Sequence, residues 1–143
     1  MTTRHHVSQA TITCEAANSL VQAVLKEGAA QKIPVSVAIV DAGGHLQAFA
    51  RHDGTAFLTV EIAIDKAWTA CSFGQPTHVW NQLVQNPHMA PLASRPHLVA
   101  VGGGCPIFAG GQLIGGIGVS GGTYEQDRDL AEKALNSLGF EVA

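Results

Sequence analysis

Two cationic side chains and their acidic neighbours carry the chemistry that the sequence offers most plainly. Arg51 and Lys66 can each hold a carboxylate, because a guanidinium binds both carboxylate oxygens and an ammonium supplies a point charge. Asp53 follows Arg51 closely, whereas Lys66 stands in the largely apolar stretch 62–70. For Lys66, a ligand role and a structural ion pair with Asp53 or Glu125 are equally open. The pattern predicts a site for an anionic ligand.

Three consecutive glycines followed by Cys105 and Pro106 form the most unusual stretch of the chain, 102–106. Backbone N–H groups without side-chain cover can donate to an anionic oxygen, so Gly103, Gly104, Cys105 and Pro106 are candidate ligand-binding residues. A plain turn between strands is an equal alternative. Cys105 has no sequence neighbour that would stabilise a thiolate, which favours a buried, unreactive thiol.

The seven histidines are scattered and lack the close spacing that is typical of a zinc site. His78 and His88 lie in the segment expected to border a cleft, and they are the candidate metal ligands. A solvated or hydrogen-bonded histidine is the commoner outcome for either residue.

The glycines at 116, 118 and 121 spell G-x-G-x-x-G, but the setting of a nucleotide-binding turn is missing. That turn needs a βαβ unit with an acidic residue about 20 positions further on, and here only one helix and a few residues follow. No nucleotide cofactor is therefore expected. We expect instead that these glycines let another backbone or a flat ligand approach the strand closely.

Two other functions stay open. One is an enzyme acting on a carboxylate-bearing metabolite, in which Arg51 binds the acid, N–H groups near Gly104 stabilise an oxyanion, and the catalytic Lys66 or Glu125 moves a proton. This mechanism requires Arg51 and Lys66 in one compact pocket. The other is an oligomeric scaffold or regulatory subunit without catalysis, which would have no pocket of ligand size.

The composition limits the partners. The 143 residues suit a single domain, 1–143, of which 1–8 form a mobile tail. Only 13% of residues are charged, so we expect a homo-oligomer whose subunit contacts cover apolar surface. A net charge of −3 without basic clusters argues against nucleic acid and membrane partners. No apolar signal peptide core is visible and the three cysteines lack paired spacing, which predicts a cytoplasmic location.

Apolar spacing predicts an α+β fold of three layers. Glycine pairs at 43–44 and 110–111 indicate two tight hairpins, so the strands should be antiparallel. Thr77 is the expected N-cap of the short third helix, and Thr123 with Gln126 forms a capping box for the last one. The order α-β-β-α-α-β-β-β-α predicts a five-stranded antiparallel sheet flanked by helices. The expected helices are 12–31, 57–74, 78–84 and 123–138, and the expected strands are 35–42, 45–52, 98–101, 106–109 and 112–120.

Three stretches together resemble one protein family. They are VAIVDAGGHLQAFARHDG (37–54), the helix containing AIDKAWTA (63–70), and GGGCPIFAGGQLIGGIGVSGGTYEQDRDLAEKAL (102–135). The set resembles the GlcG/HbpS family of small haem-binding or haem-degrading domains, and the C-terminal domain of PduO-type cobalamin adenosyltransferases. The resemblance implies a profilin-like fold, assembly into oligomers, and haem or another tetrapyrrole such as a corrinoid as the small-molecule ligand. Since a haem iron needs only one histidine from the protein, His78 and His88 are the possible iron ligands under this resemblance. The resemblance leaves haem degradation open as an activity.

Overall fold

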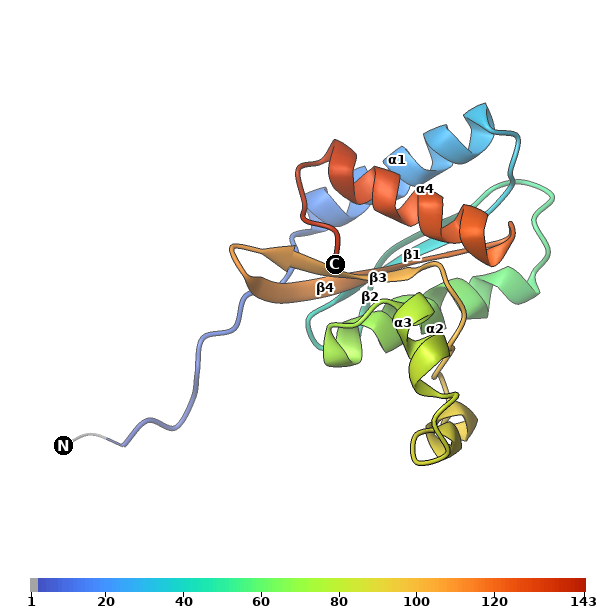
Figure 1. Cartoon of the computed structure of the whole chain (residues 1–143). Helices are drawn as coiled ribbons and strands as arrows, with labels where there is room; N and C mark the ends of the chain where they lie inside the picture. The colour runs from blue at the N-terminus through green and yellow to red at the C-terminus, as the bar shows by residue number, and fades with distance from the viewer. Residues whose placement is uncertain (1–2) are drawn as a thin grey trace.

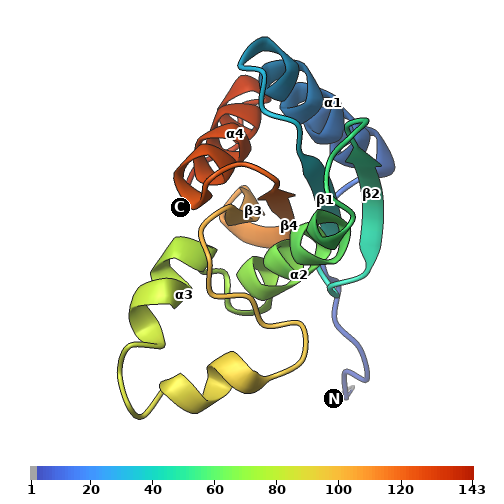
Figure 2. The same ribbon diagram turned by 90° about the vertical axis from the view of Figure 1, so that its right-hand side faces the viewer.

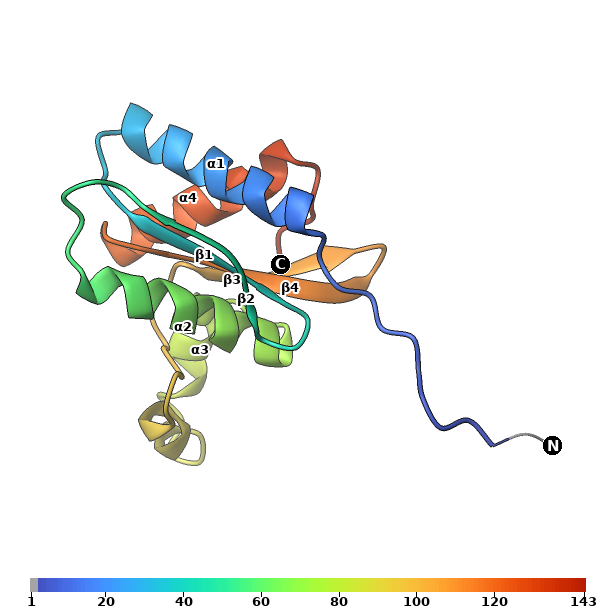
Figure 3. The same cartoon turned by 180° about the vertical axis from the view of Figure 1, so that it is seen from behind.

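The chain folds into three layers, with a β-sheet between two pairs of helices (Figure 1). A computed structural model describes residues 3–143. The helices α1 (Cys14–Ala30) and α4 (Tyr124–Ser137) cover one face of the sheet, and α2 (Leu58–Phe73) and α3 (Thr77–Leu83) lie on the other. Figure 3 shows the same layers from behind. A short 3-10 helix, η1 (Ala90–Ser94), follows α3 in the region expected to be an irregular loop.

The sheet of the described residues has four strands: β1 (Ser36–Asp41), β2 (Leu46–Arg51), β3 (Gly104–Ala109) and β4 (Gln112–Ser120). Their order is β2-β1-β4-β3, and each neighbouring pair is antiparallel. The α+β class, the antiparallel pairing and both hairpins are confirmed. The predicted count of five strands and the predicted order of elements are wrong by one strand.

The segment 98–101, predicted as a strand, forms backbone hydrogen bonds with side chains instead of with a neighbouring strand. The Val99 N–H donates to the Thr69 hydroxyl at 3.0 Å, and the Ala100 carbonyl accepts from the Asn81 side chain at 2.9 Å. Thr69 lies on α2 and Asn81 on α3. Because side chains satisfy these backbone groups, the segment crosses the two helices without pairing to a strand.

The helices α1 and α4 have side-chain caps, whereas α2 and α3 have none. The Thr13 side chain caps α1 by accepting from the Ala16 N–H, and Thr123 and Gln126 form the predicted capping box of α4. The helix α3 begins at Thr77 itself with Pro76 as its N-cap. The predicted capping role of Thr77 is wrong because its buried hydroxyl accepts from the Gly104 N–H at 2.8 Å instead. This bond fixes the start of α3 to the start of β3.

The core between the sheet and the α1–α4 layer is aliphatic. Its members come from helix positions three and four apart and from alternate strand positions, as amphipathic elements require. Each large aliphatic side chain buried there contributes roughly 1.5–3 kcal/mol to folding. The fully covered members include Leu20, Val24, Ile39, Ile117, Leu130 and Leu135.

The helix α2 packs directly on the glycine-rich face of the sheet. A Cβ added to Gly116 or Gly118 would collide with the backbone carbonyl of Ala67 or Ala63, respectively, and one added to Gly104 would collide with that of Lys66. The close approach that the glycines predict is therefore made by this chain's own helix. The glycine surface is not open to a flat ligand, contrary to that part of the expectation.

The N-terminal segment runs away from the layers (Figure 1). Of the predicted tail 1–8, residues 1–2 lie outside the described residues, and residues 3–8 are exposed and form neither helix nor strand. The sheet begins to hold the chain at Ile12, whose N–H donates to the Ile114 carbonyl at 2.9 Å. Among the described residues, no helix has the length and apolar content needed to cross a membrane.

Candidate functional site

A groove between α3 and α4 is the best candidate site. Both helices lie on the left of Figure 2, and the segment that enters β3 completes the groove. Its volume is about 520 Å³, within the range of small-molecule sites. The walls combine apolar surface with amides, one imidazole and one guanidinium. The lining residues are His78, Val79, Asn81, Gln82, Val101, Gly102, Tyr124 and Arg128.

A second depression adjoins this groove. Its volume is about 290 Å³, and His78, Tyr124 and Arg128 line both hollows. The second hollow is otherwise acidic, with Glu125, Asp129 and Glu132. Glu125, predicted as a proton-transfer residue, is exposed here at the start of α4. The α3–α4 groove, with its partly apolar walls, is therefore bordered on one side by an acidic hollow.

His78 is the only histidine that lines the groove. Its Nδ1 atom is buried and has no hydrogen-bond partner among the described residues. Burial, with a smaller contribution from the positive charge of Arg128, lowers the pKa of His78 below its ordinary value. The imidazole is therefore neutral near pH 7, which is the form that binds a metal. His88, the other predicted iron ligand, is exposed in the loop before η1 and does not line the groove.

Arg128 supplies the positive charge of the groove. Its Nε donates to Glu132 at 3.0 Å, one turn further along α4. The side chain remains 47% exposed, and its terminal nitrogens make no hydrogen bond within residues 3–143. A guanidinium with unused donors at the mouth of an apolar groove is suited to bind a carboxylate.

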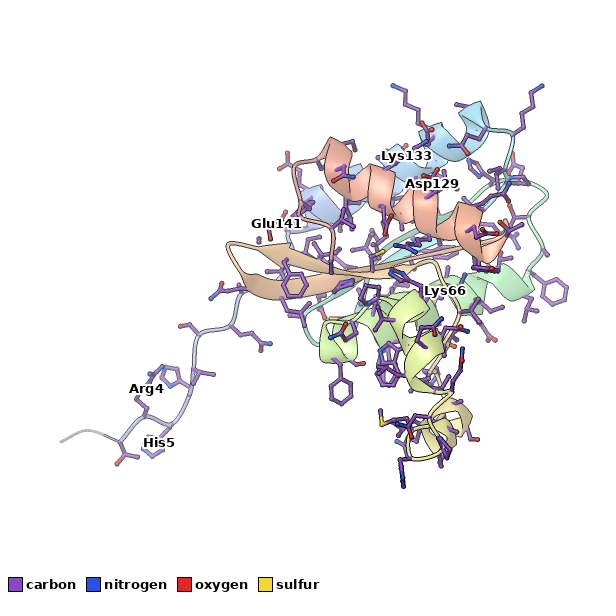
Figure 4. The ribbon with its side chains drawn as sticks, viewed as in Figure 1. Arg4, His5, Lys66, Asp129, Lys133 and Glu141 are labelled. Atoms are coloured by element: carbon purple, nitrogen blue, oxygen red, sulfur yellow. The ribbon has the colours of Figure 1, made fainter. Side chains whose placement is uncertain are left out.

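Lys66 is buried beside Gly103 and takes part in an ion pair. Its Nζ lies 3.0 Å from Asp127 Oδ2 and 2.9 Å from the Val119 carbonyl oxygen, and Figure 4 shows it in the interior below the sheet. The other oxygen of Asp127 accepts from the Gly122 N–H at 2.9 Å. Burial lowers the pKa of Lys66 and raises that of Asp127, while each charge offsets part of the other's shift. The partner is Asp127, and neither Asp53 nor Glu125.

The remaining predicted site residues fall into two groups. Gly103 and Gly104 are buried next to Lys66, and Cys105 and Pro106 are buried in β3. Burial above all raises the pKa of the Cys105 thiol to about 12, so the thiol is unreactive. Like Lys66, these buried residues do not line the groove.

Arg51 and Asp53 lie elsewhere. Arg51 ends the opposite edge strand, three strands away from β3, which is about 14 Å across the sheet. Asp53 lines a separate hollow of about 360 Å³ near the end of α1. The compact pocket that the acid–base mechanism requires, with Arg51 beside a free Lys66, is not formed by these residues.

The chain matches a known protein family over most of its length. A family model described as haem degrading protein HbpS-like matches residues 12–136. The chain belongs to this family. Protein GlcG of Escherichia coli is 35% identical over 104 residues, which cover 73% of this chain and 77% of that protein. An uncharacterised 15.0 kDa protein of Citrobacter freundii is 40% identical over 130 residues, which cover 89% of this chain and 92% of the relative. The resemblance expected from the three sequence blocks is confirmed.

Solved structures of HbpS-like proteins share the fold. A crystal structure described as a PduOC:heme complex superposes with a TM-score of 0.87 at 32% identity, covering 92% of this chain and 98% of that one. The crystal structure of HbpS has a TM-score of 0.87 at 31% identity, covering 97% and 99%. The chain also matches corrinoid adenosyltransferase PduO of Salmonella typhimurium at 36% identity, but spans only 37% of its length.

Sequence reasoning missed most of this HbpS-like chain's groove. Tyr124 is a large, largely apolar side chain at the start of α4, yet it is 60% exposed. Tyr124 and Arg128 are one helical turn apart and so share a face of α4, but periodicity does not say what that face meets. Asn81 and Gln82 carried no signal. The groove depends on the position of α3 relative to α4, and no local sequence pattern determines that position.

Proposed function

We propose that this chain binds haem or a related tetrapyrrole in the α3–α4 groove. The observation that carries the proposal is the groove's composition, in which Val79, Val101 and Tyr124 provide apolar surface beside the Arg128 guanidinium. A tetrapyrrole is a flat apolar ring with carboxylates at its edge, so it needs this combination. The haem complex of the PduOC relative supports the choice of ligand.

The groove residues fit the group on this chain's own chemistry. Tyr124 and Val101 would pack against the ring, and Arg128 would pair with a carboxylate through its unused nitrogens. The neutral imidazole of His78, which lines the groove, would bind the metal. Bound iron would supply redox and ligand-binding chemistry that side chains lack.

The remaining assignments made from the sequence stay predictions beside this proposal. His88 stays a predicted iron ligand, and Arg51 and Asp53 stay predicted ligand contacts at a position outside the groove. Phe57 and Leu58 are adjacent exposed apolar side chains at the start of α2, and they support self-association, since exposed apolar surface is often covered by a partner. The cytoplasmic location stays a prediction.

A hemin titration tests the proposal. We expect a saturable Soret shift at micromolar hemin with the wild-type chain. Arg128→Ala should weaken binding by roughly 10-fold or more, because a charge-assisted hydrogen bond contributes about 1.5–3 kcal/mol. Arg95→Ala is the matched control, since Arg95 is exposed outside the groove. Absence of a shift, or equal loss in both variants, would contradict the proposal.

Haem degradation is tested separately on the same complex. With a reductant and oxygen added, steady bleaching of the Soret band together with formation of a linear tetrapyrrole would identify degradation. A band that persists would identify a protein that only binds the ligand. Either result is compatible with the groove proposal, because both begin with the same bound state.

A further inference from the structure

His97 adopts a backbone conformation that non-glycine residues rarely take. Its φ is +70°, in the left-handed region. The Thr69 hydroxyl maintains this conformation by donating to the His97 carbonyl at 3.0 Å and accepting from the Val99 N–H at 3.0 Å. A strained residue persists only where its surroundings fix it, and such residues cluster at functional positions.

The His97 ring is oriented by two further residues of the same helix. Nδ1 of His97 lies 3.0 Å from Asp65 Oδ1, and the ring centroid lies 5.9 Å from that of Trp68. Asp65, Trp68 and Thr69 occupy positions i, i+3 and i+4 of α2, so one helix face contacts the backbone and the ring of His97. The side chain is nevertheless 66% exposed, and Nε2 has no partner within the described residues.

This arrangement is that of a metal-binding histidine. Metal-bound histidines usually donate their second ring N–H to a carboxylate, which fixes the tautomer and raises the basicity of the ligating nitrogen. Asp65 can accept such a bond from Nδ1, and Nε2 is then the free electron-pair donor. Within residues 3–143 no group of three or more His, Cys, Asp and Glu side chains could hold a bare metal ion. A metal bound at His97 must therefore bring its other donor atoms with it.

We propose that His97, oriented by Asp65, is a second position at which the chain binds the metal of a tetrapyrrole, separate from the groove. A planar macrocycle already supplies four donors, so one imidazole completes an axial position. Trp68 offers an aromatic surface beside this position. The choice of a tetrapyrrole rests on the proposed function, whereas the position of the metal ligand rests on the geometry around His97.

The test compares hemin with metal-free protoporphyrin IX on the full chain. His97→Asn is the informative variant, because asparagine tolerates a left-handed backbone and should preserve the loop. His45→Asn is the matched control, because His45 is an exposed histidine beside Asp41 that does not line the groove. With wild type we expect two hemin equivalents and the electron paramagnetic resonance signal of ferric haem with one axial imidazole. His97→Asn should lose one equivalent and its share of that signal. Asp65→Asn should weaken the same equivalent by about 10–100-fold.

The outcomes separate this inference from the groove proposal. Metal-free protoporphyrin should bind wild type and His97→Asn alike, since it has no metal for the imidazole. If His97→Asn retains both equivalents and the unchanged spectrum, the inference is wrong while the groove proposal stands. If Arg128→Ala leaves hemin and protoporphyrin binding unchanged but His97→Asn removes the ligated signal, the groove proposal fails and the inference stands. If no hemin binds at all, both fail.

Discussion

Lys66 Nζ and Asp127 Oδ2 lie 3.0 Å apart, and both side chains are almost completely buried, at 2% and 3% exposure. The pair joins α2 to the first turns of α4 across the end of β4. Its remaining hydrogen bonds go to the Val119 carbonyl and the Gly122 N–H, so neither charge is left without partners. Gly103 lies against the ammonium, where a Cβ would come within 2.9 Å of Nζ. The ion pair therefore links α2 to the start of α4, the helix that carries Tyr124 and Arg128 of the groove.

Removing the cation should destabilise the chain strongly. Lys66→Met leaves Asp127 buried without its counter-charge, and breaking a buried pair in this way costs about 3–5 kcal/mol. Urea unfolding followed by circular dichroism measures the difference. Lys133→Met is the matched control, because Lys133 pairs with Glu27 and Asp129 on the surface and its loss should cost at most about 1 kcal/mol. Equal effects of the two substitutions would show that the buried pair has no special role.

The defect of Lys66→Met should depend on pH through Asp127. Burial raises the folded-state pKa of Asp127 above its ordinary 3.8, and without Lys66 the offsetting attraction is gone. The folded variant then binds a proton that the unfolded chain releases, so its stability falls as pH rises through the interval between the two pKa values. The free-energy deficit relative to wild type should be smaller at pH 5 than at pH 8. Lys66→Met combined with Asp127→Asn should lose this pH dependence, and its persistence would assign it to another group.

Local sequence patterns predicted the elements whose ends and faces are set locally. The capping box at Thr123 and Gln126 and the glycine turns of both hairpins are such features. The segment 98–101 reads as a strand because it is short and apolar. Its backbone is nevertheless satisfied by Thr69 and Asn81, which stand 30 and 19 positions away in the chain. No local pattern shows that two helices will supply those bonds.

The candidate site was predictable only in its parts. The low charge of the helix around Lys66 left a ligand role and an ion pair with Asp53 or Glu125 equally open, and the ammonium pairs instead with Asp127, 61 positions away. The bare glycines at 116 and 118 indicated a close approach, and it is α2 rather than a ligand that approaches. Arg51 and Lys66 were assigned to one site because both are cations in the stretches that resemble the family, 37–54 and 63–70. The strand order separates them, and sequence alone does not give strand order.

The packing of α2 on the glycine strip predicts an intolerance to even one methyl group. Gly118→Ala would place a Cβ against the Ala63 carbonyl, a backbone group that cannot turn away. Overpacking of this kind costs about 1–3 kcal/mol, measured as a lower urea midpoint. Gly43→Ala is the control, since its new methyl would meet only the exposed His45 ring and, at 3.5 Å, the Asp41 carboxylate, so the change should stay within about 0.5 kcal/mol. A tolerated Gly118→Ala would mean that α2 sits farther from the sheet.

His78 should show opposite effects on stability and on binding. Its buried Nδ1 lacks a partner, and an unsatisfied buried polar atom destabilises a fold by about 1–3 kcal/mol. His78→Leu removes that atom, so unfolding in urea should need the same or a slightly higher concentration than in wild type. Hemin binding in the groove should weaken in the same variant, because the proposed metal ligand is gone.

His88→Leu is the matched control for this substitution. The exposed ring of His88 lies outside the groove, so both the urea midpoint and the hemin titration should match wild type. Loss of hemin binding in His88→Leu but not in His78→Leu would move the metal ligand from α3 to the loop before η1. A large loss of stability in His78→Leu would show that a water molecule satisfies Nδ1, and the imidazole would then have a structural role. Stability that is retained while binding weakens is the expected signature of a residue kept for its ligand.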